Sequence, residues 1–248
     1  MTPITFAIPP ARIETIIKQI LIALCLGNAF ALVLLHGAGI EDGWGVVTLL
    51  HLDREQNLPT LFSVLLLLGA SLLAGLSAHR SIPGGWLHRG WWIVSTALAL
   101  MAIDEFASIH ERVDAAMRFY LGTENLPYAA WPIPYLIIVI LAGITLWRWF
   151  FSLQFKQALG LVIAGTIYLS GAVGIELIAG EYIAQIDPDH LGHPDLTRDL
   201  FATVEETAEL CGLYLLIRTL AKGISEGPEA VSMREKNGTA FPVRTGED

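Results

Sequence analysis

Apolar runs of about 20 residues recur along almost the whole chain. A helix that crosses the hydrocarbon core of a bilayer needs about this length, because it rises about 1.5 Å per residue across about 30 Å. The composition agrees: 54% of the 248 residues are hydrophobic and only 16% are charged, whereas soluble domains carry about 25% charged residues. The sequence therefore predicts an all-α, polytopic membrane helix bundle. Its six expected transmembrane helices are residues 14–36, 59–79, 91–113, 132–151, 157–180 and 199–221.

These spans leave no room for a separate soluble catalytic domain. We expect one transmembrane domain over residues 1–222 and a flexible cytoplasmic tail over residues 223–248, because the tail is polar and rich in Gly and Pro. The first span follows the segment "MTPITFAIPPAR" and lacks a small-residue cleavage pattern. It is therefore interpreted as a retained helix and not as a removed signal peptide.

The basic residues predict the orientation of the bundle. Most Lys and Arg residues lie at the N-terminus, in the second and fourth loops between spans, and in the C-terminal region. By the positive-inside rule both termini are then cytoplasmic, and we expect a multi-pass protein of the bacterial cytoplasmic (inner) membrane. Most of the 24 Asp and Glu residues fall on the other side, so the outer face should attract cations.

The segment "MAIDEFASIHER", residues 101–112, places charged groups within the third predicted span. On a continuous helix, Asp104 and Glu105 lie about 20 Å from its inner end, still inside the outer leaflet. An Asp at a helix centre costs about 2.5–3.5 kcal/mol even on lenient insertion scales, so such groups normally face the bundle interior. These two carboxylates are therefore candidates for a functional site.

Helical periodicity extends that candidate site. On a continuous third helix, Asp104, Ser108 and Glu111 share one face, whereas His110 joins Asp114 on another side. The sixth span carries Glu205, Glu206 and Glu209 within one sector, and the fifth adds Glu176 between glycines. These further acidic groups are expected at a similar depth. Such carboxylates repel one another unless they are protonated, paired or bound to a cation. Gly212, below Glu209, predicts a close approach of another helix.

The segment "LDREQNLPTLFS", residues 52–63, carries alternating oxygen ligands at the start of the second span. Asp53, Glu55 and Asn57 are of the type that hard cations use. Capping of the helix N-terminus explains the same residues, and Pro59 suits the first helical turn. We place capping ahead of metal binding for this segment.

Several familiar sites are absent from the sequence. No late span carries a mid-membrane Lys for a retinal Schiff base, and there is neither an HExxH zinc signature nor a P-loop. The paired ExxH motifs of ferritin-like di-iron bundles are missing as well. Nothing in the composition indicates a nucleic-acid partner.

Four segments together, "LDREQNLPTLFS", "IDEFASIHER", "GIELIAGEY" and "EETAELCG", resemble a group of uncharacterised bacterial multi-span membrane proteins. A fainter similarity is to alkaline-ceramidase-like membrane hydrolases, in which a Ser, a His and an Asp surround zinc. That resemblance implies Ser63 or Ser108, together with His110 and Asp104, as counterparts by residue type. The chain departs from that pattern by lacking an HxxxH pair in its last span.

The sequence thus predicts an acidic, metal-binding cavity in the outer leaflet. The expected metal ligands are Asp104, His110, Glu111, Glu176, Glu205, Glu206 and Glu209. The expected catalytic groups are Glu105, His110 and Ser108. A carboxylate-rich site suits Fe, Mn, Ca or Mg, with Zn as an option through His110. The leading hypothesis is a metal-dependent enzyme that takes a lipid or other lipophilic substrate from the membrane; the alternatives are a cation- or proton-coupled permeation protein and a non-catalytic subunit of a membrane complex.

Overall fold

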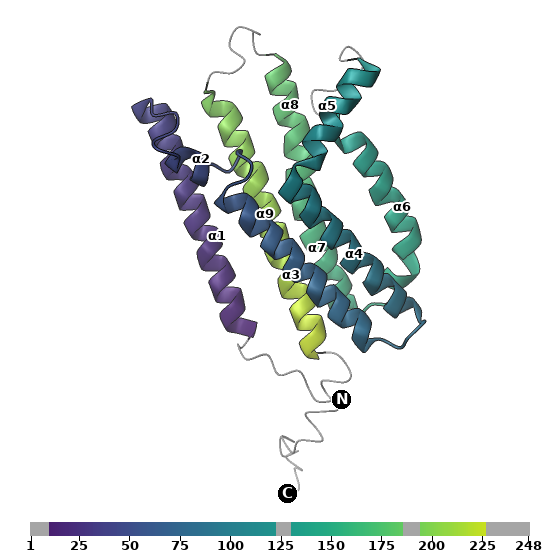
Figure 1. Ribbon diagram of the computed structural model, residues 1–248. Coiled ribbons are helices and arrows are strands. Elements are labelled where there is room, and N and C mark those ends of the chain that lie inside the picture. The colour runs from purple at the N-terminus through teal and green to yellow at the C-terminus, as the bar shows by residue number, and fades with distance from the viewer. Residues whose placement is uncertain (1–9, 123–129, 186–193, 227–248) are drawn as a thin grey trace, which may run out of the picture.

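The computed structural model describes residues 10–122, 130–185 and 194–226, which are almost entirely helical and contain no strand. The α-helices are α1 (Pro10–Leu32), α2 (Val46–Leu50), α3 (Leu58–Arg80), α4 (Trp86–Ala107), α5 (Ile109–Leu121), α6 (Pro132–Phe150), α7 (Phe155–Leu169), α8 (Glu176–Ala184) and α9 (Leu196–Glu226). Two π-helical segments, η1 (Val33–Gly37) and η3 (Ser170–Ile175), continue α1 and α7. The long helices lie side by side in an elongated bundle (Figure 1), so the all-α prediction is confirmed over the described residues.

Five helices of the described chain are long and apolar enough to cross a membrane. They cover Ala11–Gly37, Leu58–Arg80, Trp86–Ala107, Pro132–Phe150 and Phe155–Ala184. The sixth expected span lies within α9, which has 31 residues but carries too many charged side chains to meet the same criterion. The expected tail begins within this helix, since α9 continues to Glu226; the rest of the tail lies outside the described residues.

The prediction of one continuous helix over residues 91–113 is wrong. Helix α4 begins earlier, at Trp86, and ends at Ala107. Ser108 then adopts the left-handed conformation, with φ 48° and ψ 48°, and α5 begins at Ile109. Because a left-handed residue interrupts the helical periodicity, Asp104 and Glu111 do not lie on one continuous helical face.

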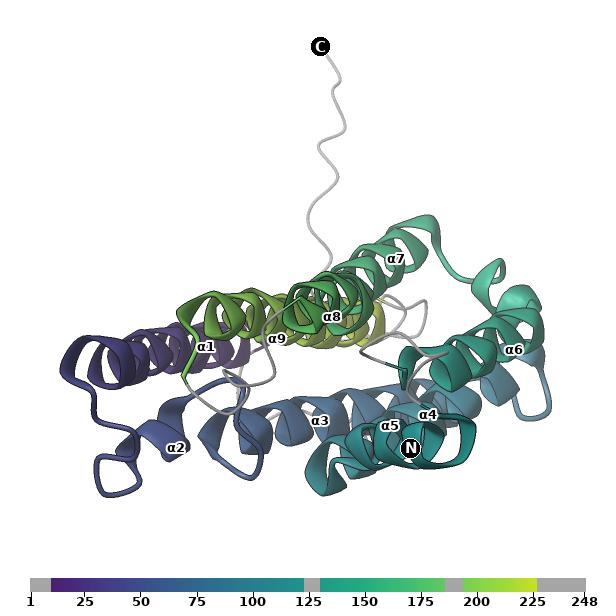
Figure 2. The ribbon, with the colours of Figure 1, turned by 90° about the horizontal axis from the view of Figure 1, so that it is seen from above.

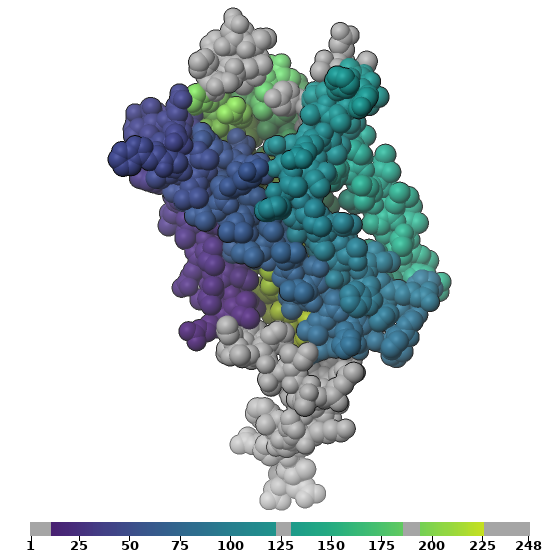
Figure 3. Space-filling view, in the orientation of Figure 1, coloured from purple at the N-terminus to yellow at the C-terminus, as the bar shows by residue number. Residues whose placement is uncertain are grey.

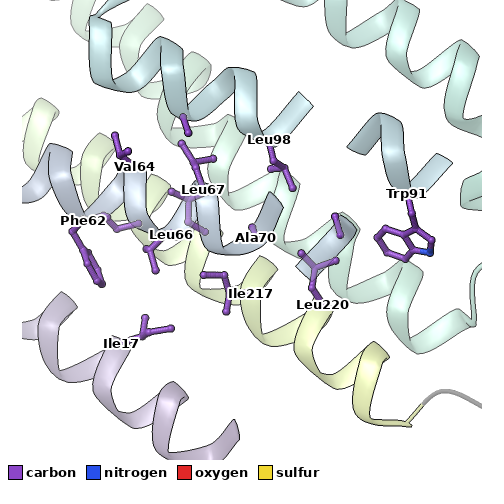
Figure 4. Close-up of a cluster of buried hydrophobic side chains, with 14 of the residues drawn as sticks. Ile17, Phe62, Val64, Leu66, Leu67, Ala70, Trp91, Leu98, Ile217 and Leu220 are labelled. Carbon is purple, nitrogen blue, oxygen red and sulfur yellow. The ribbon is translucent and has the colours of Figure 1, made fainter. Parts of the chain in front are cut away.

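The helices form two layers (Figure 2). One layer contains α1, α9 and the α7–α8 segment, and the other contains α2, α3 and α4, with α6 beside them. The hydrophobic core lies mainly between α3 and α9, where Leu66, Leu67 and Ala70 meet Ile217 and Leu220 (Figure 4). Large apolar side chains are exposed along α1, α3, α4 and α6, and these helices form the surface seen in Figure 3. Exposed apolar side chains on long helices are typical of lipid-facing surfaces.

Small residues bring neighbouring helices into close contact. A Cβ atom on Gly212 of α9 would lie 2.8 Å from the backbone nitrogen of Tyr168 in α7, so only Gly fits there. This confirms the close approach that was predicted at Gly212. In the other layer, Ser71 of α3 and Ser95 of α4 each donate a hydrogen bond to the other's backbone carbonyl, at 2.8 and 2.9 Å. Each contact thus joins two neighbouring helices within one layer.

Candidate functional site

His110 lies at the centre of a hydrogen-bonded group built from three helices. Its Nδ1 atom is 3.1 Å from Oδ2 of Asp104, at the end of α4. The hydroxyl of Tyr135, in the first turn of α6, donates to Oδ1 of Asp104 at 2.5 Å. The imidazole also lies against the ring of Trp131, with 5.4 Å between centroids. Both carboxylate oxygens of Asp104 therefore have protein partners. Asp114, one turn beyond His110, binds Arg118 and the backbone N–H of Ala130.

Glu55 joins this group from the segment before α3. Ser108 donates its hydroxyl hydrogen to Oε2 of Glu55 at 2.8 Å, and the left-handed turn at Ser108 brings α5 beside this segment. Glu55, His110 and Glu111 each offer a ligand atom, and the three atoms lie within 4.8 Å of one another. We call these three residues the Glu55 triad. Two of its members, His110 and Glu111, were predicted as ligands; Glu55 was not, because capping explained its segment.

Capping does explain the neighbouring Asn57. Its side-chain oxygen accepts hydrogen bonds from the backbone N–H and the hydroxyl of Thr60 at 3.0 and 3.1 Å, and Pro59 occupies the first turn of α3. Asn57 also donates to the carbonyl of His51 at 2.6 Å. The capping interpretation is thus confirmed for Asn57. Glu55 does not cap the helix in this way and instead accepts the hydrogen bond from Ser108. Alternating Asp, Glu and Asn was the sequence signal that could have identified it.

Buried hydrogen bonds hold the Glu55 segment in place. Asn28 of α1 is 1% exposed, accepts the backbone N–H of Leu52 at 2.9 Å, and donates to the hydroxyl of Thr203 in α9 at 2.9 Å. Asp199 of α9, also 1% exposed, lies 2.8 Å from Nε2 of His36 and 3.5 Å from Nε2 of His51. None of these contacts was predicted, because each partner comes from a distant part of the chain.

The charge of the triad depends on its burial and on the neighbouring charged and hydrogen-bonding side chains. Burial alone would lower the pKa of His110, but the hydrogen bond to Asp104 and the charges of Asp104, Glu105 and Glu55 raise it to about 9. Burial raises the pKa of Glu55. The hydrogen bond from Ser108 lowers this pKa in part, whereas the nearby charge of Glu111 raises it further. In the absence of any bound cation, His110 is therefore protonated at neutral pH.

The remaining predicted residues lie deeper, between the two layers. Glu105 is half-buried beside Ser63 and interacts electrostatically with Glu206 and Glu209 of α9. Glu209 also interacts electrostatically with Tyr168 of α7. These carboxylates thus come from both layers and face a shared region at one end of the bundle.

Glu176 connects this deeper group to His110. The indole Nε1–H of Trp131 donates to Oε1 of Glu176 at 3.4 Å, and Glu176 interacts electrostatically with Glu205 of α9. Glu176 also interacts electrostatically with His110. The structure therefore brings all the predicted site residues to one end of the bundle. It adds Glu55, Trp131, Tyr135 and Tyr168, of which the three aromatic residues carry no signal in the sequence that marks them as site residues.

The fold and site define a class of all-helical protein with several apolar helices compatible with a multi-pass membrane protein and an acidic side-chain cluster at one end. Residues 20–222 match the family model described as "Domain of unknown function (DUF8692)", and the chain belongs to this family. No curated protein and no solved structure matches the chain.

Proposed function

We propose that this chain is a metal-dependent membrane protein in which the Glu55 triad holds a divalent cation and acts on a lipid or other lipophilic substrate. The observation that carries the proposal is the convergence of three ligand atoms within 4.8 Å from two separate segments of the chain. Two carboxylates and one imidazole suit Fe, Mn or Zn better than Ca or Mg, because the last two prefer oxygen ligands alone.

Asp104 acts on the metal through His110 in this proposal. Since Nδ1 of His110 faces Asp104, Nε2 is the nitrogen left for a cation. A carboxylate on the far nitrogen of a metal-binding His fixes the ring orientation and raises the basicity of the ligand. The short hydrogen bond from Tyr135 fixes the carboxylate in turn. In this proposal Asp104 positions His110, whereas the sequence predicted it as a direct ligand.

The surrounding residues supply the further chemistry. A bound cation would polarise a carbonyl or phosphoryl oxygen or activate a water molecule. Glu105, half-buried and close to Asp104 and His110, is placed to accept the released proton. Ser108 is committed to Glu55 through its hydroxyl, so it orients this ligand. The exposed apolar surfaces of α4 and α6 beside the site favour substrate entry from the membrane.

Metal content tests this proposal directly. Protein purified in detergent, reconstituted with Fe²⁺, Mn²⁺ or Zn²⁺ and freed of excess metal, should retain about one ion per chain. Glu55→Gln, His110→Gln and Glu111→Gln should each lose it, while Glu181→Gln, at an exposed carboxylate of α8, should retain it. Folded wild-type protein that retains no ion, or triad variants that retain it fully, would exclude the proposal.

A proton-coupled permeation protein is the second candidate function. The observation that favours it is the electrostatic interaction of Glu205 with Glu176 and Glu209, because carboxylates that face one another inside a membrane bundle are typical of proton pathways. Proteoliposomes with a trapped pH dye would then show proton uptake in wild type and none in Glu205→Gln. Uptake that is unchanged by this substitution would remove the candidate.

We further propose that α9 is the sixth span of a bacterial inner-membrane protein with both termini in the cytoplasm. Its 31 residues extend about 46 Å at 1.5 Å per residue, which exceeds the hydrocarbon thickness. Helix α1 begins and α9 ends at the same end of the bundle (Figure 1). Green fluorescent protein fused at either terminus should fluoresce, whereas alkaline phosphatase should be active when fused after Gly122.

A further inference from the structure

A polar pocket lies beside the N-terminal end of α9, next to the acidic cluster. It has a volume of about 160 Å³. Its ionisable lining residues are Glu41, His51, Asp53, Arg54, Arg198 and Asp199. Cations and carboxylates thus face the same small space, which favours a ligand that carries both signs of charge.

Asp199 lines this pocket, and contacts with neighbouring side chains hold its carboxylate in place. One oxygen faces His36 and His51, and the other lies 3.4 Å from Nη2 of Arg198. His51 in turn accepts the backbone N–H of Asp53 at Nδ1, at 3.2 Å, so its Nε2 carries the hydrogen that Asp199 accepts. Because protein groups already satisfy Asp199, the ligand-binding groups must be the other charged residues of the pocket.

The two arginines retain capacity to bind an anion. Nε of Arg198 is buried and has no hydrogen-bond partner among the described residues. Arg54 donates to the hydroxyl of Thr48 at 2.5 Å and to the backbone carbonyl of Glu41 at 3.4 Å. A guanidinium has five N–H donors, and two such groups suit the oxygens of a phosphate. A buried donor without a partner destabilises the fold unless a ligand accepts its hydrogen bond.

The carboxylates of Glu41 and Asp53 complement the arginines. Within the described parts of the chain, neither carboxylate accepts a hydrogen bond or forms an ion pair at contact distance. They can therefore accept N–H groups from an ammonium. Apart from the imidazole of His51, no aromatic ring of the described residues lines the pocket, so the aromatic cage that quaternary ammonium groups favour is missing. A primary ammonium fits better.

The pocket lies at a membrane boundary. Trp44, between Glu41 and α2, is completely exposed, and Ile40, Val46 and Leu49 around it are exposed apolar residues. Trp side chains at the end of a membrane bundle favour the headgroup layer. The pocket therefore opens where phospholipid headgroups are concentrated.

We propose that this pocket binds the phosphoethanolamine headgroup of a membrane phospholipid, with Arg54 and Arg198 on the phosphate and Glu41 and Asp53 on the primary ammonium. The inference goes beyond the proposed metal-dependent function, because it requires no cation in the Glu55 triad. Headgroup binding here would hold a lipid beside the acidic cluster, since Asp53 also interacts electrostatically with Glu176.

Binding is measured on the full chain in detergent with EDTA, using native mass spectrometry and lipids with identical acyl chains. Phosphatidylethanolamine should bind about tenfold more tightly than phosphatidylcholine or phosphatidylglycerol, since a tenfold ratio corresponds to about 1.4 kcal/mol, close to one charge-assisted hydrogen bond. Arg54→Gln and Arg198→Gln should each weaken binding about tenfold. Arg89→Gln, an exposed arginine at the start of α4, should leave it unchanged.

Separate outcomes test each half of the proposal. Glu41→Gln should reduce the preference for phosphatidylethanolamine over phosphatidylcholine while the protein keeps its thermal unfolding temperature. Equal binding of the three lipids, or arginine variants that are folded and bind normally, would overturn the proposal. Soluble phosphoethanolamine that binds as tightly as the lipid would assign the pocket to a free ligand and overturn the lipid assignment. Loss of metal binding in the triad variants changes none of these readouts.

Discussion

At the scale of single residues, Asn28 shows how one buried side chain positions the candidate site. Its amide joins α1 to the segment that carries Glu55 and to Thr203 of α9. Three parts of the chain are therefore held together by one group that is 1% exposed. An alanine at this position would leave the buried backbone N–H of Leu52 without its partner, and the Thr203 hydroxyl would keep only the hydrogen bond that it donates to the carbonyl of Asp199.

Asn28→Ala should lower the free energy of unfolding by about 1–3 kcal/mol, the cost of leaving buried polar groups unsatisfied. Denaturant or thermal unfolding in detergent measures the change. Thr145→Val is the control, because Thr145 bonds only to a carbonyl of its own exposed helix, and it should change stability by less than about 0.5 kcal/mol. Equal effects of the two substitutions would contradict the anchoring role of Asn28.

His110 should make metal binding depend on pH. Its pKa is raised from 6.5 to about 9 in the folded protein, so a cation must displace a proton below pH 9. The dissociation constant should fall about tenfold per pH unit between pH 6.5 and 8.5 and level near pH 9. Isothermal titration with Mn²⁺ in detergent checks this, and a dissociation constant independent of pH would exclude His110 as a ligand.

The raised pKa of His110 also predicts how the stability of the metal-free protein depends on pH. Because the folded pKa lies above the unfolded value, the stabilising contribution of His110 is fully present below pH 6.5 and is lost as the pH rises through about 9. His110→Gln should lack this part of the pH dependence. Unfolding curves recorded with EDTA between pH 6 and 10 compare the two proteins.

Residues of the candidate site were predictable only in part. Asp104, Glu105 and the glutamates of α9 stand out in the sequence because a charge within an apolar helix is costly. Their partners do not stand out, because Tyr135 is one of six tyrosines in the chain and Glu55 is an ordinary residue near the start of a helix. The folded chain shows that Ser108, two residues before His110, donates a hydrogen bond to Glu55.

At the scale of elements, the break between α4 and α5 determines the shape of the site. A left-handed residue is costly for any side chain with a Cβ atom, by about 1–2 kcal/mol. Here it turns α5 so that His110 returns to Asp104, six residues earlier. The left-handed conformation of Ser108 thus places His110, at the start of α5, beside Asp104, near the end of α4.

Two substitutions at Ser108 distinguish a break from a continuous helix. Both Ser108→Ala and Ser108→Gly lose the hydrogen bond to Glu55, but only Gly adopts φ 48° without steric cost. The Gly variant should therefore be more stable than the Ala variant by about 1 kcal/mol. In a continuous helix the order would be reversed by about the same amount. Thermal unfolding in detergent decides between these outcomes.

The sequence predicts the helices far better than their interruptions. Apolar length identifies α1, α3, α4, α6 and the α7–α8 segment, because a membrane span must be long and apolar. The break at Ser108 has no Gly or Pro to mark it. The π-helical segments likewise carry no signal in apolar periodicity, since a single wide turn shifts the pattern by only one residue.

At the scale of the whole molecule, the α7–α8 segment, which carries Glu176, packs closely against α9, which carries Glu209. This packing fixes the position of Glu176 relative to the glutamates of α9. A Cβ on Gly171 of η3 would lie 2.7 Å from the carbonyl oxygen of Glu205, and Gly212 is equally confined by Tyr168. Since backbone atoms form these contacts, they cannot move aside alone. The distance between α7 and α9 is therefore set by glycine.

Gly212→Ala should destabilise the protein by about 1–3 kcal/mol, the usual cost of overpacking. Gly165→Ala is the matched control in α7, because a Cβ there meets no atom within 4 Å. This control should be neutral or stabilising by up to about 1 kcal/mol, since Ala favours the helix. Thermal unfolding of both variants provides the comparison, and similar destabilisation by both would contradict the packing described for α7 and α9.

The π-helical segment before Glu176 has a consequence for how insertions and deletions act on this chain. A π turn closes its hydrogen bond at residue i+5 and so contains one residue more than an α turn. Removing one residue within Ser170–Ile175 would let this stretch return to α geometry while α7 and α8 keep their facing directions. The same deletion in regular α7 would rotate everything beyond it by about 100°, which would turn Glu176 away from Glu205. Related chains that differ in length should therefore carry the change at η3.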